Sequence, residues 1–370
     1  MNMKKLIIMS HGLSANGIDS FVVNVVKMLA KEKYDVSVVL ALDDGVQQLR
    51  EQEVLEAGVS IHRTCDLGSI KRIFLHCKKL HSILRAEKPD IFHSNMDLLN
   101  GINLLVAWFA GVPVRVCHSH TSSSQYEIRN GRHILVNAYR WTMRLLCDLF
   151  SNRKCGCSEN AMEYLYGRRW REKKNSYLVS NGIDISRFSD HCNAESIRLA
   201  EGRRVIATVG RLSEVKNPQF AIFVMDELLK IRQDFKYIWV GAGELHERIQ
   251  HLITEKGLQN HVELLGARND IDAILPNCDV FLLPSLFEGL PVSLIEAQAA
   301  GIPCVISDTI TREVDCGGCQ FISLEKKPSH WASILSNILD QRTICDIDKS
   351  KLARFDTSHT IQQLESIYER

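Results

Sequence analysis

The sequence predicts an α/β protein made of two tandem, doubly wound domains, each with a parallel sheet covered by helices. Three observations indicate this class. The 370 residues are too many for one ordinary core, since a domain takes about 150 residues. Short β-branched runs alternate with glycine-bearing loops and helix-period segments, which is typical of a parallel sheet. The same alternation starts again near residue 204, so the junction is expected between Ser180 and Glu201.

The expected elements of the first half follow that alternation in order. Residues 6–9 form the first apolar run, and a polar loop follows it. From Phe21 to Leu29, apolar side chains recur at helical spacing. Further strands are expected at residues 36–40, 91–93, 114–117 and 154–157, and amphipathic helices at about 70–87 and 134–150.

The second half repeats the pattern. Its first strand ends in Gly210-Arg211, and its second ends in a Gly-Ala-Gly loop. Strands are expected at residues 204–209, 237–240, 262–265, 280–283 and 304–306, and helices at 218–230, at 245–256 and from about Leu290 onward.

Charge excludes one class of function and predicts a partner. The 45 Lys and Arg face 44 Asp and Glu, which argues against a dedicated nucleic-acid binder, usually strongly basic. The balance hides an asymmetry, because residues 1–180 carry a net charge of +8 and residues 181–370 one of −7. The excess is concentrated at residues 129–174, where 11 basic residues face 4 acidic ones. This predicts an anionic partner for the first half, with a solvated charged face as the alternative.

The apolar segments are too short for membrane insertion or export. The longest, residues 102–114, falls short of the roughly 20 residues that span a bilayer, and the N-terminal apolar run is too small for a signal peptide. Twelve cysteines are scattered along the chain, and neither Cys155/Cys157 nor Cys316/Cys319 has a second pair at metal spacing. We therefore expect a cytoplasmic protein with no metal site at its cysteines.

Ligands of open parallel sheets bind beyond the carboxyl ends of the strands, so the loops there are the candidate sites. The first spans residues 10–19 and carries Gly12 and Gly17, which let backbone N–H groups approach an anion at the next helix N-terminus. It matches neither the dinucleotide fingerprint nor the phosphate loop. A tight turn before a capped helix explains the pattern equally well.

The first strand-to-helix loop of the second half carries Arg211 and Lys216. A guanidinium and an ammonium in one loop can converge on a pair of phosphates. The alternative is solvated surface charge, but two cations at this point of an acidic half favour the phosphate site.

Glu288 and Glu296 form the third candidate. Glu288 lies in the turn after residues 280–283, and Glu296 lies about a turn and a half into the next helix, so both carboxylates can face one ligand. Carboxylates accept hydrogen bonds from sugar hydroxyls, and the helix start offers N–H groups to an oxyanion. Glu288 alone is also explained as a helix-dipole carboxylate, whereas Glu296 lies in an apolar run, where unpaired carboxylates are rare.

The fourth candidate is the triplet His118-Ser119-His120, followed by the hydroxyl-rich residues Thr121 to Ser124. Two alternating histidines can bind a metal ion, but no carboxylate or third histidine lies nearby in the sequence. Hydrogen bonding to a substrate is therefore favoured over metal binding.

Taken together, these motifs resemble glycosyltransferase family 4, retaining nucleotide-sugar-dependent enzymes with two Rossmann-like domains facing across a cleft (the GT-B fold). The strongest match is Glu288 and Glu296 with seven residues between them. The His118-Ser119-His120 triplet and residues 17–21 are similar to the subgroup that builds capsule, exopolysaccharide and O-antigen. The resemblance runs from residue 3 to the last helix. Supporting matches are Gly210-Arg211-Leu212, Lys216-Asn217-Pro218, residues 240–245, Leu265-Gly266-Ala267-Arg268 and Asn181-Gly182-Ile183-Asp184.

The resemblance implies roles for single residues. Arg211 and Lys216 neutralise the donor diphosphate, so no metal or redox cofactor is expected. Glu296 holds the ribose hydroxyls, Glu288 holds the donor sugar, and His118 approaches the transferred sugar. Further implied donor-binding positions are Gly17, Gly210, Gly241, Gly243, Ala267, Arg268, Gly289, Leu290 and Pro291, and implied acceptor-side positions are Asp19, where relatives often carry Glu, Ser119 and His120.

It also implies domains, substrates and location. The acceptor domain is expected at 1–182, a linker at 183–200, the nucleotide-sugar domain at 201–350, and a C-terminal helix at 351–370 that returns to the first domain. The expected reaction is same-face transfer from a UDP-hexose or UDP-N-acetylhexosamine, with the donor phosphate assisting deprotonation of a saccharide or polyprenyl-diphosphate-linked acceptor. The basic helices between Arg132 and Lys174 are expected to dock on an anionic membrane from the cytoplasmic side.

Two alternatives stay open. One is a nucleotide-sugar epimerase or phosphorylase on the same fold. The other is a non-catalytic partner subunit, which would be expected to lose charged site residues that this chain keeps. An NAD-dependent dehydrogenase is disfavoured, because the dinucleotide glycine pattern is absent from both halves.

Overall fold

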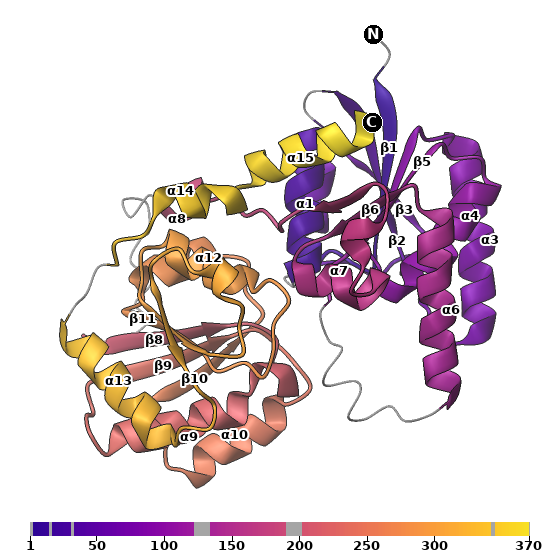
Figure 1. Ribbon diagram of the computed structural model, residues 1–370. Coiled ribbons are helices and arrows are strands. Elements are labelled where there is room, and N and C mark those ends of the chain that lie inside the picture. Colours follow the sequence, from indigo (N-terminus) through magenta and orange to yellow (C-terminus); the bar gives the residue numbers. More distant parts are fainter. Residues whose placement is uncertain are drawn as a thin grey trace. The chain divides into compact units, whose positions relative to one another are not determined.

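The structure is a computed structural model and describes residues 3–14, 17–30, 33–121, 134–189, 202–341 and 345–369. The chain divides into two compact units (Figure 1). The first comprises Met1–Gly182 together with Thr357–Arg370, and the second comprises Ile183–Asp356. Each unit is an α/β domain with a parallel sheet of its own.

The first unit is built on a seven-stranded parallel sheet with strand order β3-β2-β1-β4-β5-β6-β7. The side chains of successive β1 residues pack into the apolar cores on opposite faces of the sheet, because side chains alternate across a strand. Leu6 and Ile8 pack on one face of the sheet, and Ile7 and Met9 on the other. The strands are β1 (Lys4–Ser10), β2 (Tyr34–Leu40), β3 (Ser60–Arg63), β4 (Ile91–Ser94), β5 (Val114–Ser119), β6 (Arg153–Gly156) and β7 (Ser176–Leu178).

Helices cover both faces of this sheet. One face carries α1 (Gly17–Leu29), α2 (Glu51–Glu56) and the last helix, α15 (Thr357–Glu369). The opposite face carries α3 (Ile70–Glu87), α4 (Asn100–Phe109), α6 (Ile134–Phe150) and α7 (Glu159–Tyr166), and short 3₁₀ turns lie at Asp97–Leu99 and Trp170–Glu172.

The last helix belongs to the first unit although the second unit precedes it in the chain. Leu364, Ile367 and Tyr368 are buried with α1 in the first unit's core. The Thr360 hydroxyl donates to the Ser180 carbonyl at 3.0 Å. A Cβ on Gly182 would lie 2.4 Å from the Thr360 hydroxyl, so only glycine allows α15 this close.

The second unit repeats the topology with a six-stranded parallel sheet of order β10-β9-β8-β11-β12-β13. Both sheets therefore reverse strand order between their first strand and their fourth, the point where open sheets bind ligands. The strands are β8 (Arg204–Val209), β9 (Phe235–Val240), β10 (Val262–Gly266), β11 (Val280–Leu283), β12 (Cys304–Ser307) and β13 (Cys319–Ile322).

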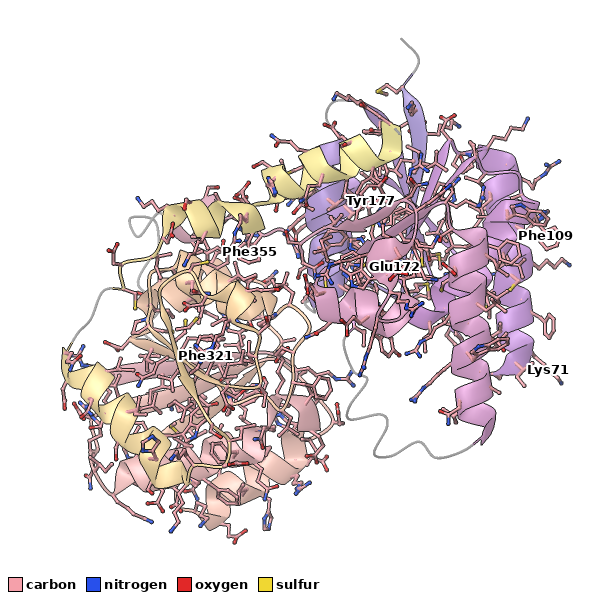
Figure 2. All side chains as sticks on the ribbon, viewed as in Figure 1. Lys71, Phe109, Glu172, Tyr177, Phe321 and Phe355 are labelled. Carbon is pink, nitrogen blue, oxygen red and sulfur yellow. The ribbon has the colours of Figure 1, made fainter. Side chains whose placement is uncertain are left out.

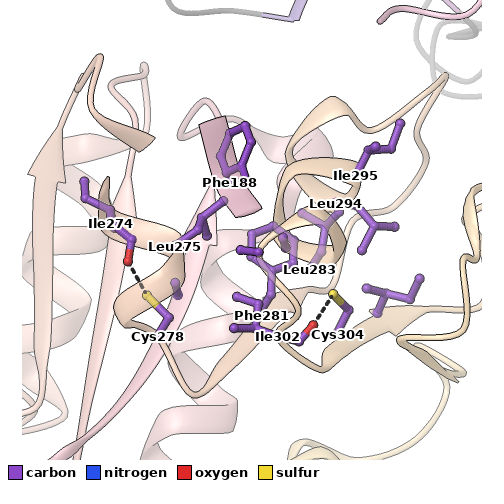
Figure 3. Packing of buried hydrophobic residues seen from close by; sticks show 14 of the residues in the cluster. Phe188, Ile274, Leu275, Cys278, Phe281, Leu283, Leu294, Ile295, Ile302 and Cys304 are labelled. Atoms are coloured by element: carbon purple, nitrogen blue, oxygen red, sulfur yellow. Dashed lines mark hydrogen bonds between the residues drawn. The ribbon is translucent and has the colours of Figure 1, made fainter. Parts of the chain in front are cut away.

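Two apolar clusters hold the helices of the second unit to its sheet. One packs α9 (Pro218–Leu229), α10 (His246–Glu255) and α13 (Pro328–Gln341). The other packs α8 (Ser186–Ser189), α11 (Ile271–Ile274), α12 (Val292–Ala299) and α14 (Lys349–Leu352), with 3₁₀ turns at Leu275–Asn277, Arg312–Val314 and Ala353–Phe355. In this second cluster, Phe281 and Leu283 of β11 lie beside Leu294 of α12, and Phe188 closes its edge (Figure 3).

Every predicted strand and helix of the described residues is present, with ends that differ by a few residues, whereas α2, α4, α7 and α13 were not predicted. The helices predicted at 70–87 and 134–150 are α3 and α6, and the strands predicted at 204–209 and 280–283 are β8 and β11. The unit limits differ from the predicted ranges in two places. Residues 183–188 belong to the second unit, since Ile183 and Phe188 are buried in its core, and the return to the first unit starts at Thr357. Most of the predicted linker lies outside the described residues.

Within the described ranges, every helix is too short or too polar to cross a bilayer.

Candidate functional site

The carboxyl edge of the second sheet is assembled by three glycines that let neighbouring loops touch. A Cβ on Gly241 would lie 2.1 Å from the Gly210 carbonyl oxygen, and one on Gly243 would lie 2.2 Å from that of Leu212. A Cβ on Gly210 would lie 2.9 Å from Cε of Lys216. The loops after β8 and β9 therefore pack backbone against backbone, an approach that larger residues would block.

Lys216 and Glu288 meet at this edge from different loops. Lys216 ends a 3₁₀ turn after β8 (Glu214–Lys216), and its Nζ lies 2.7 Å from Oε1 of Glu288, which follows β11. Their side chains are only 16% and 11% exposed. The buried Ser285 hydroxyl donates to the same Oε1 at 2.6 Å. Two donors thus fix one oxygen of the Glu288 carboxylate in a partly buried, charge-assisted arrangement.

The turn that carries Glu288 is tied to the Lys216 turn through the backbone. The Leu286 N–H donates to the Val215 carbonyl at 2.8 Å. The Ser285 carbonyl in turn accepts from the hydroxyls of Ser307 and Thr309 at 2.6 and 2.9 Å. The lysine and the glutamate therefore keep their geometry through hydrogen bonds on both sides of the pair.

Arg211 lies in the same loop but is far more exposed. Its side chain is 71% exposed and pairs with Glu244 at 3.1 Å. Exposed ion pairs of this kind contribute at most about 1 kcal/mol. Exchanging Glu244 for an anionic ligand as the partner of the guanidinium would therefore cost little free energy. Arg268, another predicted donor-binding residue, makes a bidentate pair with Asp270 within the loop after β10.

The remaining predicted donor positions lie on the loops after β10 and β11. Ala267 is exposed directly after β10. Gly289 and Leu290 are half-buried ahead of α12, and Pro291 is its N-cap. Glu296 is half-buried on α12, whose neighbouring positions Ile295 and Ala297 are in the core. All the predicted donor-binding residues of the second unit thus belong to one edge of its sheet or to the helix that begins there.

In the first unit, His118, which was predicted to approach the transferred sugar, is fully buried at the end of β5. Its Nδ1 lies 3.1 Å from Nε2 of His93, and Nδ1 of His93 lies 2.7 Å from the Tyr368 hydroxyl. Burial lowers the pKa of His93 to about 3 and that of His118 well below its usual value. These histidines are therefore neutral near pH 7 and form a hydrogen-bonded chain from α15 to β5.

His120 is held at the same edge by two amides. Its Nδ1 lies 3.0 Å from Oδ1 of Asn181, and its Nε2 lies 2.9 Å from Oδ1 of Asn95. Its ring stacks on His118 with centroids 4.2 Å apart. The Asp97 carboxylate accepts from the His120 backbone N–H at 2.8 Å, and Asp97 itself has a φ of 48°, which a non-glycine residue seldom adopts.

Asp19 organises the loop after β1 from inside. It is 3% exposed, and its Oδ2 accepts from the Ser14 N–H at 2.8 Å and from the Ser14 hydroxyl at 2.6 Å. Ser10 donates to Oδ1 at 3.3 Å. Gly17 is exposed and begins α1. The predicted acceptor-side residue Asp19 is therefore engaged in positioning the loop. Ser119, another predicted acceptor-side residue, is fully buried at the end of β5.

The structure adds residues that the motifs did not single out. Ser285 fixes Glu288, Asn95 and Asp97 hold the loop after β5, and Tyr368 reaches His93 across 275 positions of sequence. The polar cluster after the strand at 91–93 is a signal that the carboxyl-end rule could have found. The predicted hydroxyl-rich loop beyond Thr121 lies outside the described residues.

Comparisons with known proteins match both halves of the chain. Residues 15–187 match the family model described as Glycosyltransferase Family 4, and residues 192–317 match Glycosyl transferases group 1. The chain is 29% identical to the putative glycosyltransferase EpsF of Bacillus subtilis, across 99% of this chain and 96% of that protein. It is 27% identical to UDP-Gal:alpha-D-GlcNAc-diphosphoundecaprenol alpha-1,3-galactosyltransferase of Escherichia coli, across 76% of this chain and 73% of that protein.

Solved structures share the fold. Anabaena Alr3699/HepE, solved in complex with UDP and glucose, superimposes with a TM-score of 0.80 at 19% identity and 98% coverage of both chains. Sucrose-phosphate synthase from Thermosynechococcus elongatus gives a TM-score of 0.79 at 16% identity, covering 99% of this chain and 98% of that one. The predicted fold class, two doubly wound α/β domains of the GT-B type, is confirmed.

Proposed function

Because the chain belongs to the family 4 glycosyltransferases, with a group 1 second half, we propose that it transfers a sugar from a UDP-sugar to a lipid-linked or growing saccharide acceptor. The donor is a UDP-hexose or UDP-N-acetylhexosamine. The acceptor is joined to a polyprenyl diphosphate or to a growing chain, in the synthesis of a bacterial surface polysaccharide. Relatives named for diphosphoundecaprenol acceptors support the acceptor class.

The pair formed by Lys216 and Glu288 is the observation that carries this proposal. A lysine and a glutamate from separate loops, held 2.7 Å apart and mostly buried at the carboxyl edge of a parallel sheet, combine a cation for a phosphate with a carboxylate for sugar hydroxyls. The exposed Arg211 adds a second cation in the same loop. If Lys216 and Glu288 formed only a structural ion pair, the exposed guanidinium of Arg211 in the same loop would have no explanation.

The donor's charge decides the roles in the second unit. Arg211 and Lys216 neutralise the diphosphate and stabilise the charge that grows on it as the sugar leaves, so the proposal needs no metal ion or redox cofactor. Oε1 of Glu288 is occupied by Lys216 and Ser285, which leaves the other oxygen for the hydroxyls of the donor sugar. Glu296 holds the ribose, and the backbone N–H groups of Gly289 and Leu290 help Glu288 to hold the donor sugar.

The first unit supplies the acceptor side and the sugar-facing histidine. His118 is neutral, so it can accept a hydrogen bond from a hydroxyl, but it is fully buried. The transferred sugar can therefore contact the His118 ring only if the protein groups that cover the ring move when the ligand binds. Asp19 acts through Ser14 and the loop after β1, and Ser119 and His120 line the acceptor side.

We propose that transfer proceeds with retention, by attack on the same face that the diphosphate leaves. The glycosidic bond to the phosphate breaks, the acceptor oxygen bonds to the anomeric carbon, and the acceptor proton passes to the leaving phosphate oxygen. Glu288 is held by a lysine and a serine on one oxygen, which suits a hydrogen-bonding partner better than a nucleophile that must attack in line.

An epimerase on the same fold and a non-catalytic partner subunit are the competing functions. An epimerase would bind a UDP-sugar but would form no new glycosidic bond. A partner subunit would bind no donor, although this chain keeps Arg211, Lys216, Glu288 and Glu296. Product analysis separates all three.

The test is a thermal-shift panel of UDP- and GDP-sugars followed by donor hydrolysis and transfer to a prenyl-diphosphate saccharide. Ligand stabilisation follows affinity, so the true donor should raise Tm most. NMR of the new linkage should show the donor's anomeric configuration. The absence of any nucleotide shift together with the absence of hydrolysis and transfer would refute the enzyme proposal, and an inverted product would refute retention.

For location, we propose a peripheral protein on the cytoplasmic side of the membrane, because its acceptor is anchored there. The basic first half, with a net charge of +8 over residues 1–180, supports attraction to anionic lipid. The start of the segment predicted to dock, residues 132–133, lies outside the described residues.

A further inference from the structure

Exposed apolar side chains gather on three helices of the first unit. The described residues include 18 exposed large hydrophobic side chains, and ten of them lie on α3, α4 and α6. All five of the exposed aromatic residues are among the ten. We call this outer face the α3/α4/α6 surface; its exposed apolar members are Ile70, Phe74, Leu75, Trp108, Phe109, Val136, Tyr139, Trp141, Leu145 and Leu149.

The three helices form one continuous layer. α4 contacts both α3 and α6, and all three lie side by side on the same face of the sheet (Figure 1). A Cβ on Gly101 would lie 2.6 Å from the Met143 carbonyl, so the glycine lets α4 and α6 pack closely. The Trp108 ring lies 5.5 Å from that of Phe150 at the end of α6.

The apolar residues of α6 follow its outer side at helical spacing. Trp141, Leu145 and Leu149 recur at intervals of four residues and are 67%, 39% and 64% exposed, so they form one stripe. Beside the end of that stripe, Trp108 and Phe109 of α4 are 49% and 64% exposed. Water-exposed aromatic groups in such a cluster are a recognised sign of a binding surface.

The same helices are basic. Across α3, α4 and α6, seven Lys and Arg face two acidic residues, a net charge of +5. On α3 the exposed cations are Lys71, Lys78 and Arg85, and Lys71 and Phe109 both point away from the sheet on this layer (Figure 2). Arg72 and Lys79 of α3 pair with Asp43 and Asp44. Lys173 and Lys154, in the basic segment singled out from the sequence, likewise pair with Asp148.

We propose that the α3/α4/α6 surface docks on an anionic lipid bilayer. This rests on the proposed function, since a polyprenyl-linked acceptor places the reaction at a membrane. Aromatic side chains favour the interface between lipid headgroups and acyl chains, and lysines beside them are attracted to anionic headgroups. A second copy of the chain fits less well, because a two-fold contact would oppose two faces of like charge.

Tryptophan emission gives a direct test. Trp108 and Trp141 are exposed, whereas Trp170, Trp239 and Trp331 are at most 5% exposed. Vesicles of phosphatidylcholine with phosphatidylglycerol should shift the emission to the blue, and vesicles of phosphatidylcholine alone should not. Trp108→Phe/Trp141→Phe should remove the shift but keep co-sedimentation, because phenylalanine still inserts. A full shift in that variant would overturn the proposal.

Paired variants test the apolar and charged parts separately. Trp141→Ser/Leu149→Ser should reduce sedimentation with anionic vesicles at least 10-fold, whereas the control Leu55→Ser/Ile231→Ser, exposed elsewhere, should not. Lys71→Gln/Lys78→Gln/Arg85→Gln should weaken binding about 100-fold, from roughly 1 kcal/mol per cation. Its control is Lys326→Gln/Lys327→Gln/Lys349→Gln, three exposed lysines of the second unit.

The outcomes separate this surface from the activity. All variants should keep the parent's Tm and its shift with UDP. Vesicle binding that none of the surface variants reduces would overturn the docking surface and leave the enzyme proposal standing. Dimerisation that the surface variants abolish, without vesicle binding, would assign the face to a second copy. Vesicle binding through this surface in a protein that binds no nucleotide would instead refute the proposed function.

Discussion

The two units share one strand order, yet they place polar groups at the carboxyl edge in opposite ways. The first unit buries four histidines, His76, His93, His118 and His120. At this edge His93 is hydrogen-bonded to His118, and His120 is held by hydrogen bonds to Asn181 and Asn95. Within its described residues, the second unit buries no histidine and instead exposes or half-buries Arg211, Lys216 and Glu288. A neutral, preorganised hydrogen-bond network suits hydroxyl groups, and accessible charge suits a diphosphate.

The same contrast holds on the outer surface. Of the 18 exposed large hydrophobic side chains among the described residues, 16 belong to the first unit and two, Ile231 and Leu286, to the second. The shared fold therefore does not determine how apolar the surface of each unit is. The difference comes from the outward positions of α3, α4 and α6, which carry exposed aromatic residues.

The largest expected effect is the loss of the second unit's charged site. Glu288→Gln keeps the size of the side chain but removes the charge that pairs with Lys216, and donor-sugar hydrogen bonds made by a carboxylate weaken with it. We expect kcat/KM to fall on the order of 10³-fold, about 4 kcal/mol in the barrier. The measurement is steady-state transfer from the preferred UDP-sugar.

Glu247→Gln is the matched control, because Glu247 is exposed on the neighbouring helix α10 and should change the rate less than 2-fold. If Glu288→Gln retained full activity, the charged edge of the second unit would have no role in transfer.

The next effect concerns the close approach of loops in the second unit. Gly241→Ala would place a methyl group 2.1 Å from the Gly210 carbonyl oxygen, so one of the two loops must move. We expect the second unit to lose about 3 kcal/mol of unfolding free energy and to bind the donor more weakly, measured by chemical denaturation and by UDP-induced thermal shift.

Gly257→Ala separates steric clash from backbone conformation. Gly257 has a φ of +69° with nothing near its Cβ position, so alanine there should cost only about 1 kcal/mol. Equal losses in the two variants would mean that the packing of the loops after β8 and β9 does not matter.

The buried histidines predict that acid destabilises the first unit before the second. Their pKa values are lowered by burial, that of His93 to about 3, so between that value and about 6.5 the unfolded chain binds protons that the folded unit does not. Stability is therefore present at pH 7 and falls as the pH drops below about 6.5, by roughly 1.4 kcal/mol per pH unit for each such histidine.

Limited proteolysis during thermal unfolding at pH 7 and pH 5 identifies which unit opens first. At pH 5 the first cuts should fall within residues 3–182. His93→Gln should reduce the pH dependence of Tm, since glutamine does not titrate. First cuts in the second unit at pH 5, or an unchanged pH slope in His93→Gln, would contradict this assignment.

The elements that the sequence pattern missed explain the limits of prediction. β3, β7 and β13 were not predicted, and all three are edge strands. An edge strand is covered on fewer sides, so Ser60–Arg63 lacks the buried apolar run that marks β1 or β11. α4 was seen only as an apolar stretch, because a helix packed between α3 and α6 is apolar on most sides.

The site divides in the same manner. Lys216 and Glu288 lie in loops that follow strands, so the carboxyl-end rule finds both without any knowledge of their contact. Tyr368 cannot be found this way, since its bond to His93 depends on α15 returning across the sheet. The role of Ser285 could not be predicted from the sequence either, because a single serine after a proline is common in turns of any function.

Ser285 provides the smallest effect and the finest test of the second unit's site. Its hydroxyl donates to the Glu288 oxygen that Lys216 also contacts, so Ser285→Ala leaves the carboxylate paired but less firmly oriented. A hydrogen bond to a charged group contributes about 1.5 kcal/mol, and we expect roughly a 10-fold loss of kcat/KM, more in kcat than in KM. Ser285→Thr should restore most of it. Ser333→Ala, which removes an exposed hydroxyl on α13, should leave the kinetics unchanged. If Ser285→Ala lowered only Tm, the serine would stabilise the fold and Glu288 would be oriented by Lys216 alone.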